Sequence, residues 1–254
     1  MKKHPFFIQK YLENRPSFYA YIRPQEAILF YDRITKMKGP ILDFGCGDGF
    51  FASTIFRKKY IDVGLDVASS RMKESTKTGV YKQLEEYDGM TIPFKSRVFG
   101  SIISNCVFEH IPHIEKSIQE MNRVTKKNGL LMTTVMCSSW SDNLLGKKIF
   151  GKKYTDWFNG IQHHDSLFSK SKWTKLFTSN GYRVVESVDY LFEKASQKTE
   201  MYHFFSFFSL ITYLMLRRWS IFPSVSEKKI EEIERIVRED KNNPSACFFV
   251  LQKA

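Results

Sequence analysis

Short apolar runs alternate with amphipathic segments through the middle of the chain. Runs with the length of buried strands occupy residues 41–44, 61–65, 98–104 and 130–136. Between them, residues 50–57 and 114–125 repeat apolar positions at the spacing of a helix that buries one face. Strands and helices that alternate in this way predict an α/β fold, with a mostly parallel sheet covered by helices on both faces.

The pattern extends beyond these segments in both directions. Residues 168–181 predict a capped helix that stops at a glycine, residues 183–190 predict another strand, and residues 247–251 predict a last one. Ahead of the first run, residues 11–37 are rich in aromatic side chains and contain apolar positions at helical spacing. We therefore expect a helical segment before the first strand of the sheet.

The first predicted strand runs directly into three glycines at alternate positions, Gly45, Gly47 and Gly49. Glycine is needed where the backbone approaches a ligand closely or takes a positive φ, and a following helix offers free N–H groups and a positive dipole. The spacing is not that of a dinucleotide fingerprint, because Phe50 stands where the last glycine would be. A P-loop sequence is absent as well. The turn therefore predicts a nucleotide-type site that is neither an NAD site nor a P-loop.

Residues 41–49 closely resemble the first motif of the class I S-adenosylmethionine (SAM) dependent methyltransferases, whose glycine turn holds the amino-acid end of SAM. Asp66 closes the second strand about 20 residues after the glycines, where a carboxylate accepts ribose hydroxyls; a solvated loop acid is the alternative. Asp88 matches the family's acid before the fourth strand, which binds the exocyclic amine of adenine. The family's Phe-Asp at the start of that strand is Phe99-Gly100 here. The resemblance covers residues 39–136 and continues more loosely to Asp189.

This resemblance implies a Rossmann-like, doubly wound, seven-stranded, mostly parallel sheet with helical insertions, whose last strand runs antiparallel beside residues 183–190. It also implies SAM as cofactor and S-adenosylhomocysteine as product. The cofactor-binding residues that it implies are Asp43, Gly45, Cys46, Gly47, Asp66, Val67, Asp88, Gly89 and Asn105. The predicted divisions are a helical cap at residues 1–38, the SAM-binding core at 39–190, a helical insertion at 191–244 and the final strand of the core sheet at 245–254.

Helices before the first strand commonly cover bound SAM in families of this kind. Tyr11, Tyr19, Tyr21 and Arg23 are therefore candidates for cofactor contacts. Plain packing of the cap is the alternative for each of them.

Ligands of open α/β sheets bind beyond the carboxyl ends of the strands, where two clusters of polar residues are expected. Glu109-His110 follows the fourth strand, and His163-His164-Asp165 ends a long insertion that begins at Cys137. Methyl transfer from a sulfonium needs a base only if the acceptor carries a proton. We favour His110 as the base or orienter, and Glu109 and His164 as further catalytic groups. Contacts to the acceptor are expected from His163, Asp165 and Trp157.

A structural reading of both clusters stays open. Glu109-His110 would then cap the following helix, and the later histidines would bond their loop to the body. A zinc site is disfavoured, because the adjacent histidines lack helical spacing and no cysteine lies near them.

Composition agrees with one catalytic domain plus additions. The 254 residues are 43% hydrophobic, which is enough for a sizeable core. The four cysteines lie in or beside apolar strand patterns with no C-x-x-C spacing, which predicts buried free thiols and a reducing compartment. Residues 1–5 are basic but no adequate apolar run follows, which argues against a secretory signal. We therefore expect a cytoplasmic protein.

Residues 204–216 form an apolar run that ends at Arg217-Arg218-Trp219. A helix that crosses a bilayer needs about 20 residues, so this run is too short to cross one. It is also too apolar for an ordinary surface helix. We predict a helix that lies against the protein body or an interface. A homodimer contact or peripheral contact of residues 204–219 with the inner membrane surface are the alternatives, and the net charge of +12 favours an anionic partner. From Ser224, a further helix with Glu227 as capping partner is expected.

Within the family, the pattern resembles enzymes that methylate small molecules, including sugars and lipid-linked biosynthetic intermediates. That resemblance implies methyl transfer to an O or N acceptor. An RNA methyltransferase is the alternative with the same chemistry. It is disfavoured because the Asn/Asp-Pro-Pro-Tyr/Phe signature is absent after the fourth strand and no RNA-binding motif is evident. A noncatalytic SAM-binding protein or a membrane-surface scaffold is the alternative from another class.

Overall fold

The computed structural model describes residues 3–57, 60–68, 70–216, 219 and 225–254. The strands are β1 (Ile41–Phe44), β2 (Ile61–Val67), β3 (Tyr81–Tyr87), β4 (Phe99–Asn105), β5 (Thr125–Met136), β6 (Tyr182–Tyr190) and β7 (Ala246–Lys253). The α-helices are α1 (Lys3–Asn14), α2 (Tyr19–Tyr31), α3 (Phe50–Phe56), α4 (Met72–Ser75), α5 (Ile114–Val124), α6 (Ser139–Asn143), α7 (Leu145–Phe150), α8 (Lys152–Ile161), α9 (Lys170–Ser179), α10 (Glu193–Leu216) and α11 (Glu227–Glu239). Short 3₁₀ turns are η1 (Ile34–Lys36), η2 (Thr76–Thr78) and η3 (Phe108–His110).

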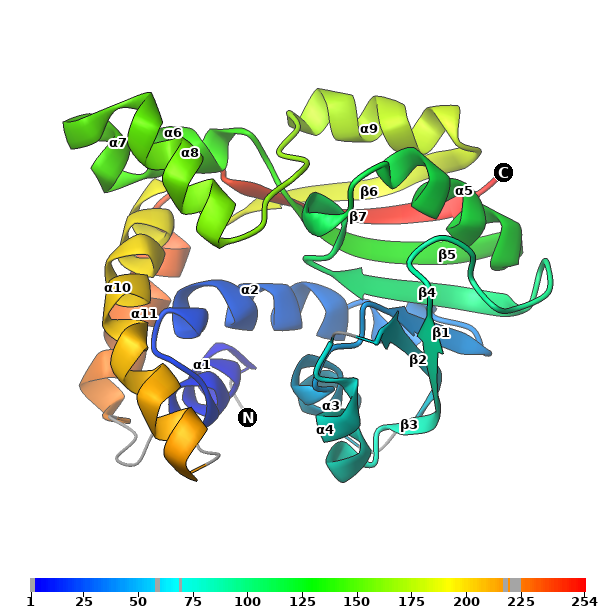
Figure 1. Cartoon of the computed structure of the whole chain (residues 1–254), viewed down its shortest axis with the longest axis horizontal. Helices are drawn as coiled ribbons and strands as arrows, with labels where there is room; N and C mark the ends of the chain where they lie inside the picture. Colours follow the sequence, from blue (N-terminus) through cyan, green and yellow to red (C-terminus); the bar gives the residue numbers. More distant parts are fainter. Residues whose placement is uncertain (1–2, 58–59, 69, 217–218, 220–224) are drawn as a thin grey trace. The chain divides into compact units, whose positions relative to one another are not determined.

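All seven strands join one sheet in the order β3-β2-β1-β4-β5-β7-β6. β1 pairs in parallel with β2 and with β4, and β7 runs antiparallel. Figure 1 shows α5 and α9 over one side of this sheet. The predicted α/β class and the seven-stranded Rossmann-like sheet are confirmed.

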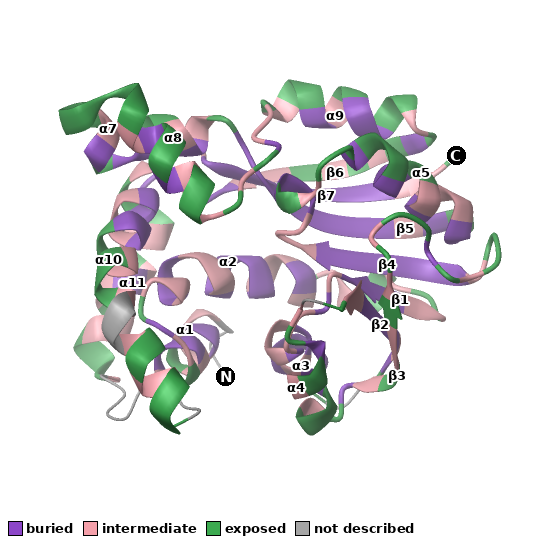
Figure 2. Cartoon of the chain, viewed as in Figure 1, coloured by how far each residue is buried: buried purple, intermediate pink, exposed green. Residues whose placement is uncertain are grey.

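The core lies where central strands meet α5 and α9. Side chains of β1, β4 and β7 such as Leu42, Ile102 and Phe249 are fully buried, and Trp173 and Phe177 of α9 pack against the same cluster. Figure 2 accordingly shows β4, β5 and β7 as buried over most of their length. Central strands of a covered sheet are apolar on both faces, so their runs are continuous in the sequence.

The chain divides into two compact units. A sheet unit comprises residues 30–137, 163–188 and 247–254, and a helical unit comprises residues 1–29, 138–162 and 189–246. The predicted core at residues 39–190 differs from this division, because residues 138–162 pack with helices of the helical unit. The buried residue Glu200 on α10 is 2% exposed. Its carboxylate accepts from Leu145 N at 2.5 Å and from Gly146 N at 2.9 Å. The start of α7 is thereby fastened to α10.

Several elements differ from the predictions. No strand was predicted over β3, which forms one edge of the sheet and is rich in polar side chains, with no fully buried residue. Residues 126–129, which separate the predicted helix at 114–125 from the predicted strand at 130–136, belong to β5; Asn128 takes φ 59° there, and the register with β4 shifts. Helices α6 to α8 were not predicted either. α11 begins at the cap Ser226, whose side chain accepts from Lys229 N, whereas Ser224 lies outside the described residues.

The apolar run at residues 204–216 is helical and forms the second half of α10. The predicted helix is therefore present, but the structure buries only part of its surface, because large side chains such as Phe205, Leu214 and Met215 are more than half exposed. The interface that was predicted as an alternative to burial against the protein body stays a prediction. Arg217 and Arg218, which follow the apolar run, lie outside the described residues. Among the helices that the structure describes, none is both long and apolar enough to cross a bilayer.

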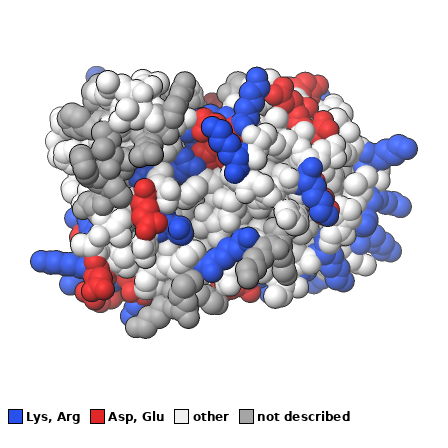
Figure 3. Space-filling model, turned by 90° about the horizontal axis from the view of Figure 1, so that it is seen from below, with Lys and Arg blue, Asp and Glu red and all other residues white. Residues whose placement is uncertain are grey.

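Charge is unevenly spread over the surface. On the face drawn in Figure 3, Lys and Arg side chains gather toward one end, while Asp and Glu form small groups. The excess of 39 basic over 27 acidic residues gives the chain its net charge of +12.

Candidate active site

The glycine turn begins where β1 ends. Gly45, Gly47 and Gly49 all have positive φ, at 77°, 53° and 72°. The backbone N–H groups of Gly45 and Cys46 donate to Leu65 O at 2.8 and 3.2 Å, which ties the turn to β2. A Cβ at Gly45 would collide with the Val107 side chain, whereas a Cβ at Gly47 would meet nothing within 4 Å. Gly45 is therefore needed for packing, whereas at Gly47 only the positive φ favours glycine.

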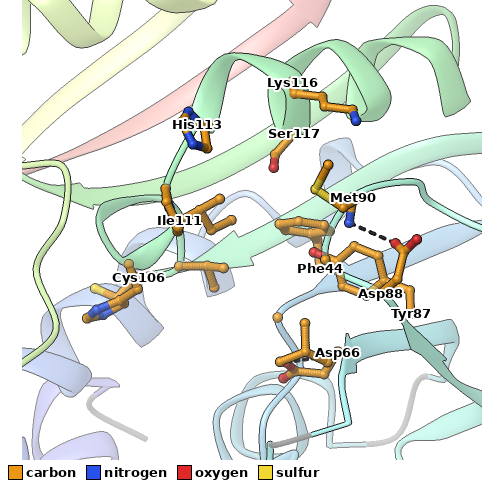
Figure 4. Close-up of a pocket in the computed structure, with 16 residues that line it drawn as sticks. Phe44, Asp66, Tyr87, Asp88, Met90, Cys106, Ile111, His113, Lys116 and Ser117 are labelled. Carbon is orange, nitrogen blue, oxygen red and sulfur yellow. Dashed lines mark hydrogen bonds between the residues drawn. The ribbon is translucent and has the colours of Figure 1, made fainter.

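A cavity of about 580 Å³ lies beyond the carboxyl ends of β1 to β4 (Figure 4). Among the predicted cofactor and catalytic residues, those that line it are Gly45, Asp66, Val67, Asp88, Gly89 and His110. The predicted cofactor residues that do not line it are Asp43, Cys46, Gly47 and Asn105. The cavity has the size typical of small-ligand pockets, and its position is the one expected for an open α/β sheet.

Asp66 lies at one end of the cavity. Its carboxylate accepts from Gly47 N at 2.6 Å and from Val67 N at 2.8 Å. Burial raises the pKa of Asp66, and these two backbone bonds oppose that rise. A carboxylate held in this way retains lone pairs for the hydroxyls of a ribose.

Asp88 lies after β3, on another wall of the cavity. Backbone N–H groups of Thr91 and Met90 donate to it at 2.9 and 2.8 Å, the second bond being drawn in Figure 4. These bonds hold the pKa of Asp88 below its ordinary value. Asp88 therefore stays ionised and suits an amine donor such as the one on adenine.

Asp43 lies behind the glycine turn and is 5% exposed. Tyr81 of β3 donates its hydroxyl to Asp43 Oδ2 at 2.6 Å. Burial raises the pKa of Asp43 to about 7, against the effect of this bond. Burial likewise raises the pKa of the Cys46 thiol. Asn105 accepts at Oδ1 from Thr134 Oγ1 at 2.9 Å.

The two predicted polar clusters meet in the sheet unit. The backbone N–H groups of Asp165 and Ser166 donate to Glu109 O at 2.8 and 2.9 Å. His110 Nδ1 lies 3.0 Å from the carbonyl oxygen of His163. A carbonyl oxygen only accepts, so Nδ1 carries the proton of the neutral ring and Nε2 keeps its lone pair.

His164 packs behind His110 without lining the cavity. The centroids of the two rings are 5.1 Å apart. Burial, and secondarily the nearness of His110, lowers the pKa of His164 to about 3, so this ring is neutral at pH 7. Glu109 is fully buried, whereas His163 and Asp165 are exposed. Of the two catalytic histidines predicted, His110 alone reaches the cavity.

Comparisons with known proteins assign the chain to a family. A family model described as a methyltransferase domain matches residues 11–187. The chain belongs to this methyltransferase family. It is 22% identical over 184 residues to a ubiquinone biosynthesis O-methyltransferase of Bartonella bacilliformis, covering 68% of this chain and 73% of that protein. It is 29% identical over 129 residues to a malonyl-[acyl-carrier protein] O-methyltransferase of Legionella pneumophila, covering 48% of this chain and 42% of that protein.

Solved structures show the same fold at low identity. A geranyl diphosphate C-methyltransferase of Streptomyces coelicolor, in complex with S-adenosylhomocysteine, superposes with a TM-score of 0.55 at 13% identity, covering 91% of this chain and 79% of that one. The [4+2]-cyclase SpnF superposes with a TM-score of 0.58 at 15% identity, covering 90% and 80%. The protein is a SAM-dependent methyltransferase, and SAM is its cofactor.

The residues of this methyltransferase fit the cofactor. Gly45 of the glycine turn lines the cavity, and the two carboxylates Asp66 and Asp88 line it at separate strand ends. Their spacing along the sheet edge suits the ribose and the adenine amine of one nucleoside. Within the described ranges, no three His, Cys, Asp or Glu side chains gather into a metal-binding group.

Sequence reasoning missed part of the methyltransferase cavity. The residues that it missed include Tyr87, Met90, Ile111, His113, Lys116 and Ser117. His113 precedes α5 at φ 57°, and Figure 4 shows Lys116 and Ser117 on the first turns of that helix above the cavity. The rule that loops after parallel strands line the ligand site would have found the residues of the β4–α5 loop.

The predicted contacts from other segments of the methyltransferase lie in the helical unit. Tyr11 and Tyr21 are 2% and 0% exposed, and Arg23 forms an ion pair with Glu26 at 2.7 Å. These contacts support the packing alternative for the cap. Trp157, the predicted acceptor contact, lies on α8 and is half exposed.

Proposed function

We propose that this methyltransferase methylates a hydroxyl oxygen of a small, lipophilic biosynthetic intermediate, with His110 as the general base. The observation that carries the proposal is the bond between His110 Nδ1 and the His163 carbonyl, which leaves Nε2 as the basic nitrogen of a ring at the cavity wall. Two curated relatives are O-methyltransferases by name, which supports oxygen as the acceptor atom.

The cavity residues Asp66 and Asp88 would hold SAM, which would supply an activated methyl group and leave as S-adenosylhomocysteine. A neutral hydroxyl must lose its proton as the new carbon–oxygen bond forms. His110 Nε2 accepts that proton and later releases it to solvent. The His163 carbonyl holds the ring in the required tautomer and stabilises the imidazolium through the Nδ1 proton.

Neighbouring groups keep His110 in place. The loop of residues 163–166 is fastened to Glu109 O by two backbone bonds, so the His163 carbonyl has a fixed position. His164 supports the ring of His110 as a neutral neighbour and therefore adds no positive charge that would resist protonation of the base. We assign His110 as the catalytic residue and His164 as a positioning residue.

A transfer assay with labelled SAM tests the proposal. Phenols, aliphatic alcohols, sugars, amines and unmodified RNA are offered as acceptors. With the best acceptor, His110→Ala should lower kcat by about 10²–10⁴-fold, while affinity for S-adenosylhomocysteine stays the same. His113→Ala, at another histidine of the same cavity wall, is the matched control and should keep most of the rate.

Three results would contradict the proposal. One is a wild-type rate in His110→Ala, which would exclude His110 as the general base. Another is transfer to an amine or to RNA in preference to every hydroxyl compound. The third is intact binding of S-adenosylhomocysteine with no transfer to any acceptor, which would favour the noncatalytic alternative.

A further inference from the structure

Three helices of the helical unit expose large apolar side chains to solvent. Ile149 and Phe150 on α7 are 74% and 67% exposed, and Met215 near the end of α10 is 76% exposed. Figure 2 shows exposed residues along α7, α8 and the second half of α10. Contiguous apolar surface of this kind is rare on monomeric soluble domains and marks a contact with something else.

Ring contacts join side chains of α7, α8 and α10 into one surface. The ring centroid of Phe150 lies 6.2 Å from that of Tyr154, which lies 5.7 Å from that of Trp157. Trp157 in turn stacks on Phe204 of α10 with centroids 6.3 Å apart. The apolar side chains therefore form a continuous row from α7 across α8 to α10.

α10 extends this row along its own axis. Ile211 and Met215 follow Phe204 by about two and three helical turns, so the three lie on one face. We name the outer apolar surface by these residues: Ile149, Phe150, Trp157, Phe204, Ile211 and Met215.

Lysines accompany the apolar side chains. Residues 142–161 contain four lysines (147, 148, 152 and 153) and two aspartates (142 and 156), so their net charge is +2. Lys152 has an 84% exposed side chain, and Lys153 precedes Trp157 by about one turn on the same face of α8. The ion pairs of these lysines are exposed, so they are weak and leave the positive charge available.

We propose that the outer apolar surface docks this protein onto an anionic lipid bilayer. Helices that lie in a membrane interface combine Trp, Phe and Leu on one side with lysines near the head groups. Trp157 suits the interfacial level, and the lysines attract anionic head groups. The proposal is independent of the assigned acceptor: it states where the enzyme works, and a lipophilic intermediate is concentrated in the same place.

A second copy of the chain fits this surface less well. A twofold dimer presses the same patch of both copies together, so it would bring the two +2 segments into proximity. Juxtaposed like charges oppose association, whereas an anionic bilayer attracts them.

Vesicle flotation of the full chain tests the proposal, with vesicles of phosphatidylcholine alone or with about 30 mol% phosphatidylglycerol. The parent should bind the anionic vesicles roughly tenfold more strongly. Ile149→Glu/Phe150→Glu should abolish this binding. Lys148→Gln/Lys153→Gln should weaken it several-fold on anionic vesicles only.

Matched controls come from exposed residues of the sheet unit. Tyr60→Glu/Val185→Glu replaces two exposed apolar side chains and should leave vesicle binding unchanged. Lys126→Gln/Lys127→Gln removes the same charge as the lysine pair above and should also have little effect. Circular dichroism of each variant confirms folding.

The proposal is overturned if the parent does not float with anionic vesicles. It is also overturned if both glutamate pairs reduce flotation equally. Light scattering measures the oligomeric state. If the parent is a dimer that does not bind vesicles, and Ile149→Glu/Phe150→Glu is a monomer, the outer apolar surface is a contact with a second copy and the proposal is overturned.

Discussion

The sheet unit and the helical unit place their apolar side chains in opposite ways. Strand residues such as Leu42 and Phe249 are fully buried, and the sheet unit leaves polar groups, among them Asp66 and Asp88, around a cavity. The helical unit instead leaves Phe150 and its neighbours exposed on the outer faces of helices. Polar groups in a cavity suit a small ligand, whereas apolar helix faces suit an extended apolar partner. The candidate cofactor cavity and the proposed docking surface thus belong to separate units.

The largest expected effect concerns the glycine turn of the sheet unit. Gly45→Ala places a Cβ against Val107 and forces a non-glycine residue to φ 77°. Strain at such a backbone and overpacking together should lower the free energy of unfolding by about 2–5 kcal/mol and abolish binding of S-adenosylhomocysteine. Urea unfolding and calorimetry measure the two effects.

Gly79→Ala is the matched control for that variant. Gly79 also has a positive φ, at 63°, but a Cβ there would meet nothing within 4 Å. Gly79→Ala should lower the free energy of unfolding by only about 1–2 kcal/mol and leave binding of S-adenosylhomocysteine intact. Equal losses in the two variants would show that backbone strain alone, rather than the contact with Val107, determines the effect.

An intermediate effect is expected in the helical unit at Glu200. Its buried carboxylate accepts from the backbone of Leu145 and Gly146 at the start of α7, and from the Tyr154 hydroxyl. Glu200→Gln loses one acceptor and should lower the free energy of unfolding by about 1–3 kcal/mol. Because the site lies in the helical unit, affinity for S-adenosylhomocysteine should not change. A large loss of affinity would contradict the separation of the two units.

The smallest expected effects concern the pH dependence of stability, to which the buried residues Asp43 and His164 of the sheet unit contribute in opposite directions. Asp43 has a folded pKa of about 7 against an ordinary 3.8, so its stabilising contribution is full below pH 3.8 and is lost as pH rises toward 7. His164 has a folded pKa of about 3 against 6.5, so its contribution is full above pH 6.5 and is lost as pH falls.

Variants at Asp43 and His164 should therefore change the pH dependence of the free energy of unfolding in opposite directions. Relative to the parent, Asp43→Asn should gain stability as pH rises from about 4 to 7, and His164→Gln should gain stability as pH falls over that range. Each change in slope is at most about 1.4 kcal/mol per pH unit. Urea unfolding at several pH values measures them, and parallel profiles for all three proteins would contradict the burial of these groups.

The same contrast explains what the sequence could predict. The glycine turn and the apolar runs of central strands were predicted because buried parallel strands leave continuous patterns. β3 was missed because residues such as Lys82 and Glu86 face solvent on the sheet edge. α7 and α8 were missed because Gly146, Gly151 and Gly160 interrupt their helical pattern. The bond between His110 and the His163 carbonyl joins distant segments, so only the fold could reveal it.

Titration calorimetry with S-adenosylhomocysteine tests most directly the claim that the cavity of the sheet unit is the cofactor site. The parent should bind this ligand and not NAD. Asp66→Ala should weaken binding by about 1–3 kcal/mol through loss of charge-assisted bonds to the ribose. Glu86→Ala is the matched control, because Glu86 pairs with Asp66 across β2 and β3 but points to solvent, and its affinity should equal that of the parent. Equal affinity of the parent and Asp66→Ala, or tight binding of NAD with none of S-adenosylhomocysteine at millimolar concentration, would contradict the account.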